Sequence, residues 1–407
     1  MTRFVLILTL LLCANLHAAT QRIVGGANTQ APGWMASLQA AYGTPPYVNF
    51  GHVCGASLIS AEWVVTAAHC VDGLNVAQIQ VLVGSSRLST AGYRSNIDQL
   101  VLHPQWQPLG DNTVNDPGSF ANDIALLHLT EPLVNSPISL ATRSQTQALT
   151  TDSYLTAYGW GAIDAAGVTK PDQLQSVTLP YLGFLMPQEL PDHLFAGQVA
   201  GENICFGDSG GPLAQGNLLF GLASFVTNST ADRSPCANPG SASGFTAIAS
   251  HRAWLLAQQQ GLTATSHQHL QVRSGDAGWI PFVIRNYSQA SWELGQITSS
   301  SPLDAACQQT TLAPGDECTL AVAYSARDPG VTETIRIDYS ATSSLGSQSN
   351  SLWLTVQNID AATLSIQEPV RPAQNSSGGG SVSLLTLLAL WLALWLLPRR
   401  PTRGKRT

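Results

Sequence analysis

The chain has 407 residues, of which 44% are apolar, and this length is enough for two or three domains with sizeable cores. Charged residues make up 11% and the formal net charge is −7. This balance excludes a basic nucleic-acid-binding surface and a disordered chain held open by charge. Seven cysteines are few for a small disulfide scaffold but fit a larger exported protein, and 35 glycines and 23 prolines predict many turns, hence strands more than long helices.

Residues 1–19 have the pattern of a signal peptide. Arg3 precedes an apolar run over residues 4–12, and residues 17–19 form a plausible cleavage zone. The alternative, a short anchor helix, would not span a bilayer comfortably. Cys13 could mark a lipoprotein, although the leucines before it are larger than such sites favour. Removal of the peptide would take Cys13 with it and leave six cysteines, an even number for an oxidising compartment.

Short apolar runs separated by Gly, Pro and Asn turns follow over residues 23–262. Such spacing predicts an all-β sandwich or barrel. The clearest runs are residues 56–59, 63–65, 79–83, 124–127 and 218–220. In this region the pattern indicates a helix over residues 250–261 alone, where a glycine ends it.

Residues 268–365 change character and alternate between apolar and polar side chains. The alternation is clear in residues 318–324, 334–339 and 352–356, and it predicts half-buried strands. About 100 residues of this kind favour an immunoglobulin-like β-sandwich. Cys307 and Cys318 flank a Leu-Ala-Pro-Gly turn, so we expect a local disulfide between them. The stretch resembles bacterial immunoglobulin-like modules, contains no cluster of catalytic residue types, and is interpreted as a spacer or docking module.

Three short motifs carry the chemistry. They are Thr-Ala-Ala-His-Cys at 66–70, Asn-Asp-Ile-Ala-Leu-Leu at 122–127 and Gly-Asp-Ser-Gly-Gly-Pro at 207–212. Hydrolysis by a serine nucleophile needs a hydroxyl, a base that takes its proton, and a carboxylate that sets the tautomer of the base. Ser209, His69 and Asp123 supply these three groups. Each alone could be a core histidine, a cap or a turn, but their order and separations of 54 and 86 residues argue for one site.

In these motifs the sequence resembles the trypsin/chymotrypsin-like serine peptidases over about residues 23–262. The resemblance implies a fold of two six-stranded β-barrels, with Ser209 as nucleophile, His69 as general base and Asp123 as its buried partner. It also implies that the backbone N–H groups of Gly207 and Ser209 form the oxyanion hole. Tyr-Gly-Trp-Gly at 158–161 matches a further strand and loop of the family.

The same resemblance implies an activation site. Residues 20–22 would be a short propeptide, and Arg-Ile-Val-Gly-Gly at 22–26 looks like the family's cleavage sequence. Cutting after Arg22 would free the ammonium of Ile23, which would pair with buried Asp208 and order the oxyanion hole. Disulfides Cys54–Cys70 and Cys205–Cys236, and a Ser224 that supports the buried aspartate, are implied as well. Another common family bridge is missing, since residues 181–190 and 194–197 hold no cysteine.

The substrate pocket departs from that of trypsins. Asn203 stands where trypsins hold an aspartate, and a neutral amide cannot pair with a substrate arginine. Phe225 and Val226 replace the usual Trp-Gly, and Ile204 and Val226 narrow the pocket. The pocket also includes Ser224 and is completed by Ser243 or Gly244. We therefore expect a preference for small or medium uncharged side chains before the scissile bond.

That preference has one alternative and one consequence. An acid from another loop, such as Asp232, would restore basic specificity if it reached the pocket. Otherwise the enzyme would cut poorly after Arg22, and a separate trypsin-like protease would have to activate it.

The C-terminus has the three parts of a sorting tail. A linker over residues 366–381 contains Gly378, Gly379 and Gly380, an apolar helix is expected over 382–398, and residues 399–407 are basic. Basic residues after an apolar span hold that end in the cytoplasm and place the body outside. The arrangement resembles the GlyGly-CTERM tails that rhombosortase, a rhomboid-type intramembrane protease, cuts. The alternative is a permanent membrane anchor.

The sequence as a whole predicts an exported serine endopeptidase that needs no cofactor or metal. Its expected partners are protein or peptide substrates, an activating trypsin-like protease, the sorting protease and, before tail processing, the membrane. Two alternatives are a catalytically silent binding protein or adhesin that acts through the immunoglobulin-like module, and an esterase on the same fold. An intact set of motifs argues against the silent protein.

Overall fold

The computed structural model describes residues 26–359, apart from 43–48, 91, 110–119, 165, 186, 187, 189, 199–201, 228–235, 237–240, 305 and 327–329. The predicted signal peptide, the propeptide over residues 20–22, Ile23, Asp232 and the sorting tail lie outside the described residues.

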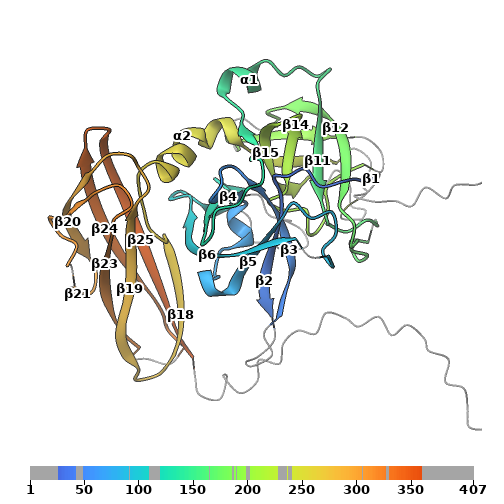
Figure 1. Cartoon of the computed structure of the whole chain (residues 1–407). Helices are drawn as coiled ribbons and strands as arrows, with labels where there is room; N and C mark the ends of the chain where they lie inside the picture. The colour runs from blue at the N-terminus through green and yellow to red at the C-terminus, as the bar shows by residue number, and fades with distance from the viewer. Residues whose placement is uncertain are drawn as a thin grey trace, which may run out of the picture. The chain divides into compact units, whose positions relative to one another are not determined.

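The first half of the described chain closes into a barrel of six antiparallel strands, drawn in blue to teal in Figure 1. Its strands are β2 (Met35–Tyr42), β3 (Asn49–Leu58), β4 (Trp63–Thr66), β5 (Ile79–Val83), β6 (Tyr93–Leu102) and β9 (Ala125–Leu129). Every residue of β4 and β9 is buried, which explains why these strands read as continuous apolar runs and not as alternating ones.

A second ring of six strands follows. The ring is closed because β12 pairs with both β11 and β13. The ring runs β12-β11-β14-β15-β16-β13 and returns to β12. Its strands are β11 (Tyr154–Gly159), β12 (Gln175–Gly183), β13 (His193–Gly197), β14 (Pro212–Gln215), β15 (Leu218–Val226) and β16 (Ala242–Ala247). Two short strands, β1 (Ala27–Asn28) and β10 (Ser139–Leu140), add to it. The expectation of two six-stranded barrels is confirmed.

Short elements surround the barrels. They are β7 (Gln107–Pro108), β8 (Phe120–Ala121), the 3-10 turns η1 (Ala68–Cys70) and η2 (Val76–Gln78), α1 (Arg143–Gln147) and α2 (Ile248–Gln259). Helix α2 is the predicted helix, shifted two residues toward the N-terminus. Helix α1 was not predicted, although Thr142 and Gln145 form a capping box that signals its start.

The remaining described residues form two further sheets. One contains β17 (Leu262–Thr263), β19 (Ala277–Asn286), β23 (Glu317–Ser325) and β21 (Leu303–Asp304). The other contains β18 (His267–Arg273), β25 (Gly346–Ile359), β24 (Thr332–Ser343), β20 (Trp292–Ser299) and β22 (Thr311–Leu312). Both sheets contribute to one apolar cluster. From Ile335 to Ala341, β24 alternates buried residues with exposed or half-buried ones, as expected.

The C-terminal region is therefore additional β structure, while its immunoglobulin-like identity stays a prediction. Strand β17 pairs with β19 of this region, although Leu262 was the last residue of the predicted peptidase domain. Among the described residues no helix is long and apolar enough to cross a membrane.

Candidate active site

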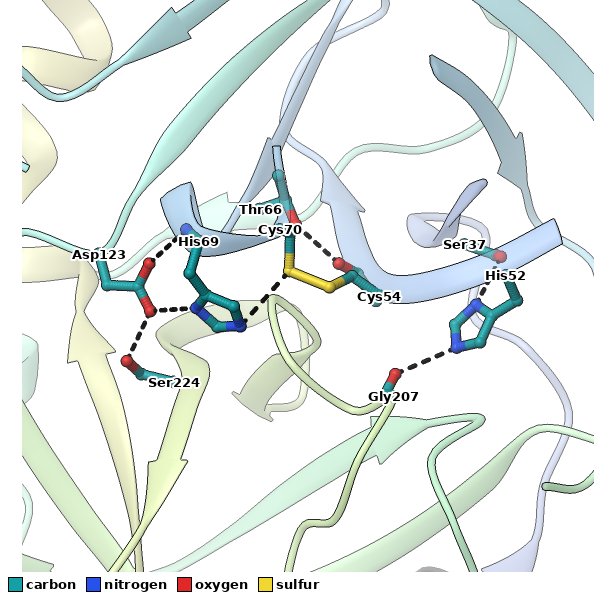
Figure 2. Close-up of a disulfide and its surroundings, with 10 residues drawn as sticks. Ser37, His52, Cys54, Thr66, His69, Cys70, Asp123, Gly207 and Ser224 are labelled. Atoms are coloured by element: carbon teal, nitrogen blue, oxygen red, sulfur yellow. Dashed lines mark hydrogen bonds and ion pairs between the residues drawn. A yellow bond between two sulfur atoms is a disulfide. The ribbon is translucent and has the colours of Figure 1, made fainter. Parts of the chain in front are cut away.

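Strand pairing in the first barrel brings His69 and Asp123 together. Thr66 at the end of β4 lies opposite Ala125 at the start of β9. His69 follows β4 by three residues and Asp123 precedes β9 by two, so both lie at the same end of this antiparallel pair. His69 Nδ1 lies 2.7 Å from Asp123 Oδ2, and the backbone N–H of His69 donates to Asp123 Oδ1 at 2.9 Å (Figure 2). Both carboxylate oxygens thus hold the histidine.

The second barrel adds a third hydrogen bond to this carboxylate. Ser224 Oγ donates to Asp123 Oδ2 at 2.6 Å (Figure 2), and Asp123 is completely buried. Burial would raise the pKa of Asp123, but the charge of His69 and the hydrogen bonds from His69 and Ser224 outweigh it and lower the pKa. The carboxylate is therefore held in its charged form beside the imidazole.

The pKa of His69 is shifted in the opposite direction. Burial would lower its pKa, but the charge of Asp123 and the hydrogen bond to it outweigh burial and raise the pKa above 6.5. Phe120 stacks on the imidazole, with ring centroids 4.9 Å apart and planes inclined by 16°. The position of the histidine is thus set by the aspartate at its edge and by an aromatic ring on its face.

Ser209 lies in a tight loop before β14. The turn depends on glycines in the left-handed region, with φ of 103° at Gly207 and 72° at Gly210. The backbone N–H of Gly55 in β3 donates to the carbonyl oxygen of Ser209 at 2.7 Å, which ties the loop to the first barrel. Among the described residues no hydrogen bond joins Ser209 Oγ to His69 Nε2, although both residues line the same cavity.

The backbone around Ser209 offers two free donors. The N–H groups of Gly207 and Ser209 donate to no group of the described residues, whereas the intervening Asp208 N–H donates to Cys205 O at 2.9 Å. The carbonyl oxygen of Gly207, which shares its peptide unit with the Asp208 N–H, accepts a hydrogen bond from His52 Nε2–H at 3.0 Å (Figure 2). Two N–H groups beside a serine can donate hydrogen bonds to an oxygen that develops negative charge.

His52 was not singled out from the sequence. Ser37 Oγ donates to its Nδ1 at 2.8 Å, and its Nε2 contacts Gly207 O (Figure 2). Burial lowers the pKa of His52 to about 4, so the ring is neutral and one tautomer satisfies both contacts. The position of His52 in the sequence, two residues before Cys54, does not indicate its contact with Gly207, which lies 155 residues further along the chain.

Asp208 is buried beneath the serine loop. Its carboxylate accepts hydrogen bonds from the backbone N–H groups of Gly161 at 2.7 Å and Cys205 at 2.8 Å. Burial raises its pKa to about 6, and the two hydrogen bonds and the charge of Lys170 oppose the rise. A Cβ on Gly159 or Gly161 would overlap this carboxylate, so these glycines make room for it.

A cavity of about 250 Å³ opens beside His69 and Ser209. Four of the six expected pocket residues line it: Ile204, Ser224, Phe225 and Val226. The other two, Asn203 and Ser243, are buried and hydrogen-bonded to each other through their side chains, and they do not line the cavity. Two aromatic side chains that the sequence did not point out, Phe120 and Phe206, complete the wall, and Phe206 is 57% exposed.

Three disulfides join the cysteines that the structure describes, in the expected pairs: Cys54–Cys70, Cys205–Cys236 and Cys307–Cys318. The first anchors η1 with His69, and the second lies at the wall of the cavity. Cys54, His69 and Cys70 are also the one cluster of potential metal ligands within the described residues. Because both sulfurs are in a disulfide, neither is a thiolate that could bind a metal.

Comparisons with known proteins agree with this geometry. A family model described as Trypsin matches residues 23–255. Kallikrein 1-related peptidase b8 of Mus musculus is 30% identical over 277 residues, which cover 62% of this chain and 97% of that protein. A trypsin of Simulium vittatum is 35% identical over 223 residues, covering 50% of this chain and 82% of the relative.

Solved structures show a similar fold. The VesB protease of Vibrio cholerae matches with a TM-score of 0.60 at 21% sequence identity. The match covers 83% of this chain and 100% of the VesB chain. The secreted serine protease VesC of the same organism has a TM-score of 0.61 at 21% identity, with 82% and 71% covered. These shares exceed the part matched by the family model, so the likeness in fold extends into the C-terminal sheets. Since the family model covers more than half of the sequence, the chain belongs to the trypsin family of serine peptidases and is a hydrolase.

Proposed function

We propose that Ser209, His69 and Asp123 act as a catalytic triad that cuts peptide bonds through an acyl-enzyme. The observation that carries this proposal is the double hold of buried Asp123 on His69, at the rim of the cavity that Ser209 lines. The Nδ1–H bond to the carboxylate sets the tautomer and leaves Nε2 as the basic nitrogen.

In the proposed reaction His69 Nε2 takes the proton of Ser209 Oγ as this oxygen attacks the substrate carbonyl carbon. The same proton then passes to the leaving amine, whose bond to the carbonyl breaks. Water, deprotonated by His69, hydrolyses the acyl-enzyme and restores Ser209. Asp123 stays ionised and stabilises the imidazolium that forms in each step.

The backbone N–H groups of Gly207 and Ser209 form the oxyanion hole in this proposal. Support comes from their lack of other acceptors among the described residues and from the hydrogen bond that Ala162 N–H donates to Phe206 O at 2.9 Å, which fixes the carbonyl side of the peptide unit that carries the Gly207 N–H. Donors of this kind typically contribute about 10²–10³-fold to the rate.

Activation is proposed to follow cleavage after Arg22. The freed ammonium of Ile23 would then pair with Asp208, whose buried carboxylate has a raised pKa and accepts two backbone hydrogen bonds. A cation beside it would lower that pKa and stabilise the charged form. Because the carboxyl group belongs to the residue between Gly207 and Ser209, the ion pair would brace the proposed oxyanion hole.

The primary specificity is proposed to be for small or medium uncharged residues. The cavity walls contributed by Ile204, Phe225 and Val226 are apolar, and its volume is about 250 Å³. The nearby side-chain amide of Asn203 is neutral and already accepts a hydrogen bond from the Ser243 hydroxyl. A buried substrate guanidinium would find no anion among these residues and would be costly to desolvate.

The export and sorting steps remain part of this proposal. The signal peptide at residues 1–19 would direct the body out of the cytoplasm, and a rhomboid-type protease would cut near Gly378–Gly380. Without that cut the apolar segment over 382–398 would keep the protein anchored. Replacing the three glycines with valine tests this step, since the variant should stay in the membrane fraction with its tail uncut; unchanged release into the medium would contradict it.

A fluorophosphonate probe tests the triad. The full chain, cleaved after Arg22 with immobilised trypsin, should be labelled at Ser209, while Ser209→Ala should not be labelled. Ser144→Ala, a change at an exposed serine in α1, is the matched control and should label normally. An unlabelled but correctly cleaved wild-type protein would favour a catalytically silent binding protein.

Purified precursor tests the pocket and the activation step together. With the proposed apolar pocket it should release the Ile23 N-terminus slowly and no faster than the Ser209→Ala precursor. Rapid, concentration-dependent self-conversion, together with efficient cleavage of arginyl peptides, would overturn the specificity proposal and leave the triad proposal intact.

A further inference from the structure

Asn122, the residue before Asp123, has an unusual backbone conformation. Its φ is 51°, in the left-handed region that non-glycine residues seldom adopt, although asparagine tolerates it best. In this conformation Asn122 O accepts a hydrogen bond from Ile124 N at 2.8 Å, so the chain turns sharply on either side of Asp123. Such a conformation persists when surrounding contacts hold it.

Those contacts come from three separate segments of the chain. Asp192, just before β13, accepts a hydrogen bond from the backbone N–H of Asn122 through Oδ2 at 2.7 Å. His251 of α2 lies on the other side, with Nε2 3.2 Å from Asn122 Oδ1. The third contact is within the first barrel, where Asn122 Nδ2 donates to Gln105 O at 3.0 Å.

Asp192 is itself fixed at both its backbone and its side chain. Ala247 N, at the junction of β16 and α2, donates to Asp192 O at 2.7 Å. His193 Nδ1–H donates to Asp192 Oδ1 at 3.0 Å, and the carboxylate is 13% exposed. Burial would raise the pKa of Asp192, but the bond and charge of His193, the Asn122 N–H and the charge of His251 outweigh it and lower the pKa. An ionised acceptor makes a stronger bond to the backbone N–H than a neutral one.

We propose that Asp192 is a positioning residue that holds the Asn122–Asp123 turn of the first barrel against the second barrel. This proposal rests on the proposed role of Asp123 in the triad. Ser224 holds the Asp123 side chain from the second barrel, and Asp192 holds the backbone from which that side chain projects. Two separate attachments therefore set the placement of the carboxylate relative to Ser209.

The same residue lies next to the substrate pocket. His193 is hydrogen-bonded to Asp192 through its side chain. The centroid of its ring lies 5.4 Å from that of Phe225, which lines the cavity. A defect at Asp192 could thus act through the triad or through the pocket, and these routes predict different kinetics. Loss of triad placement lowers kcat, whereas a disturbed pocket wall raises KM.

The test compares Asp192→Ala and Asp192→Asn in the full chain after cleavage at Arg22. The matched control is Asp152→Ala, an exposed aspartate of the same half of the molecule with no part in this network. Fluorophosphonate labelling counts the competent Ser209 sites, and kcat and KM are measured per labelled site on a fluorogenic peptide with alanine before the scissile bond. A variant that merely folds less well has fewer labelled sites but a normal rate at each.

We expect Asp192→Ala to lower kcat per labelled site and the labelling rate about 10- to 100-fold, with KM changed less than about threefold, because small misplacements of a catalytic group cost up to about 10²-fold. Asp192→Asn keeps an acceptor oxygen and should recover most of the loss. If Asp192→Ala does not fold, the proposal is judged on Asp192→Asn, which should then lose about three- to tenfold.

The positioning role would be overturned if kcat per labelled site stayed within twofold of wild type in Asp192→Ala or, where that variant does not fold, in Asp192→Asn. A rise in KM alone would overturn it as well. Absence of labelling in the wild-type protein would instead overturn the triad proposal on which it rests.

Discussion

The two barrels contribute to the active site in different ways. In the first, His69 and Asp123 sit just beyond the ends of two paired and fully buried strands, β4 and β9, so the sheet itself sets their spacing. In the second, Ser209 sits in a glycine-rich loop whose shape depends on positive φ angles and on the buried side chain of Asp208. The proposed base is thus placed by strand pairing and the proposed nucleophile by a loop.

The loop that carries Ser209 needs a rigid support to be placed accurately. Here the supporting hydrogen bonds join one barrel to the other. Gly55 N donates to Ser209 O, His52 donates to Gly207 O, and Ser224 Oγ donates to Asp123. Each joins a residue of one barrel to a site residue of the other. The placement of Ser209 relative to His69 and Asp123 therefore depends on these contacts between the two barrels.

The largest effect should come from removing one reacting group from each barrel. His69→Ala and Ser209→Ala should each lower kcat on the order of 10⁶-fold, and the double variant should be no slower than the worse single one, because the groups act as a unit. Single-turnover assays with a fluorogenic peptide measure this. Additive losses, or activity within 100-fold of wild type in either variant, would contradict a shared site.

A second prediction targets a close contact between the two barrels at Gly55. A Cβ on Gly55 would lie 2.6 Å from the Cα of Gly211 and 2.8 Å from its nitrogen, so Gly55→Ala must displace the serine loop. We expect kcat to fall about 10²-fold or more. Gly33→Ala in the same half of the molecule, where the nearest atom would be 3.6 Å away, is the control and should stay near wild type. Equal activity of the two variants would show that the contact does not position Ser209.

A third prediction concerns Asp208 in the uncut precursor. Its pKa of about 6 in the folded state exceeds the ordinary aspartate value of 3.8, so the folded state binds the proton more tightly than the unfolded state. The resulting stability is fully present below about pH 3.8 and is lost as pH rises through 6, a decline of about 3 kcal/mol relative to Asp208→Asn. Denaturant unfolding of both precursors between pH 3.5 and pH 7.5 measures the difference.

Cleavage after Arg22 should remove that decline, because the proposed pairing with the Ile23 ammonium lowers the pKa of Asp208. Identical pH profiles of cut and uncut protein would count against the pairing.

The smallest expected effect is a pH shift at His69. The imidazole must be neutral to take a proton, and its pKa is raised above 6.5 by Asp123. Therefore kcat/KM should fall about tenfold per pH unit below an inflection that lies above pH 6.5, as pH–rate measurements at constant ionic strength would show. An inflection below 6.5 would mean that burial, and not the aspartate, dominates the environment of His69.

Local sequence patterns determined much of this protein. Buried strands were predicted from apolar runs, and α2 was predicted as a helix that a glycine ends. The three motifs indicated a serine peptidase because each keeps its residues within six positions. The sorting tail and activation site were likewise predicted from local patterns and remain predictions.

The tertiary structure alone decided how distant residues meet. The contact of His52 with Gly207 spans 155 residues, and that of Asp192 with Asn122 spans 70. The stacking of Phe120 on His69, and the burial of Asn203 behind the cavity wall, likewise arise from the packing of separate chain segments. Neither a periodicity nor a motif encodes such pairs, because they depend on how two closed barrels pack against each other and not on the spacing of residues along one segment.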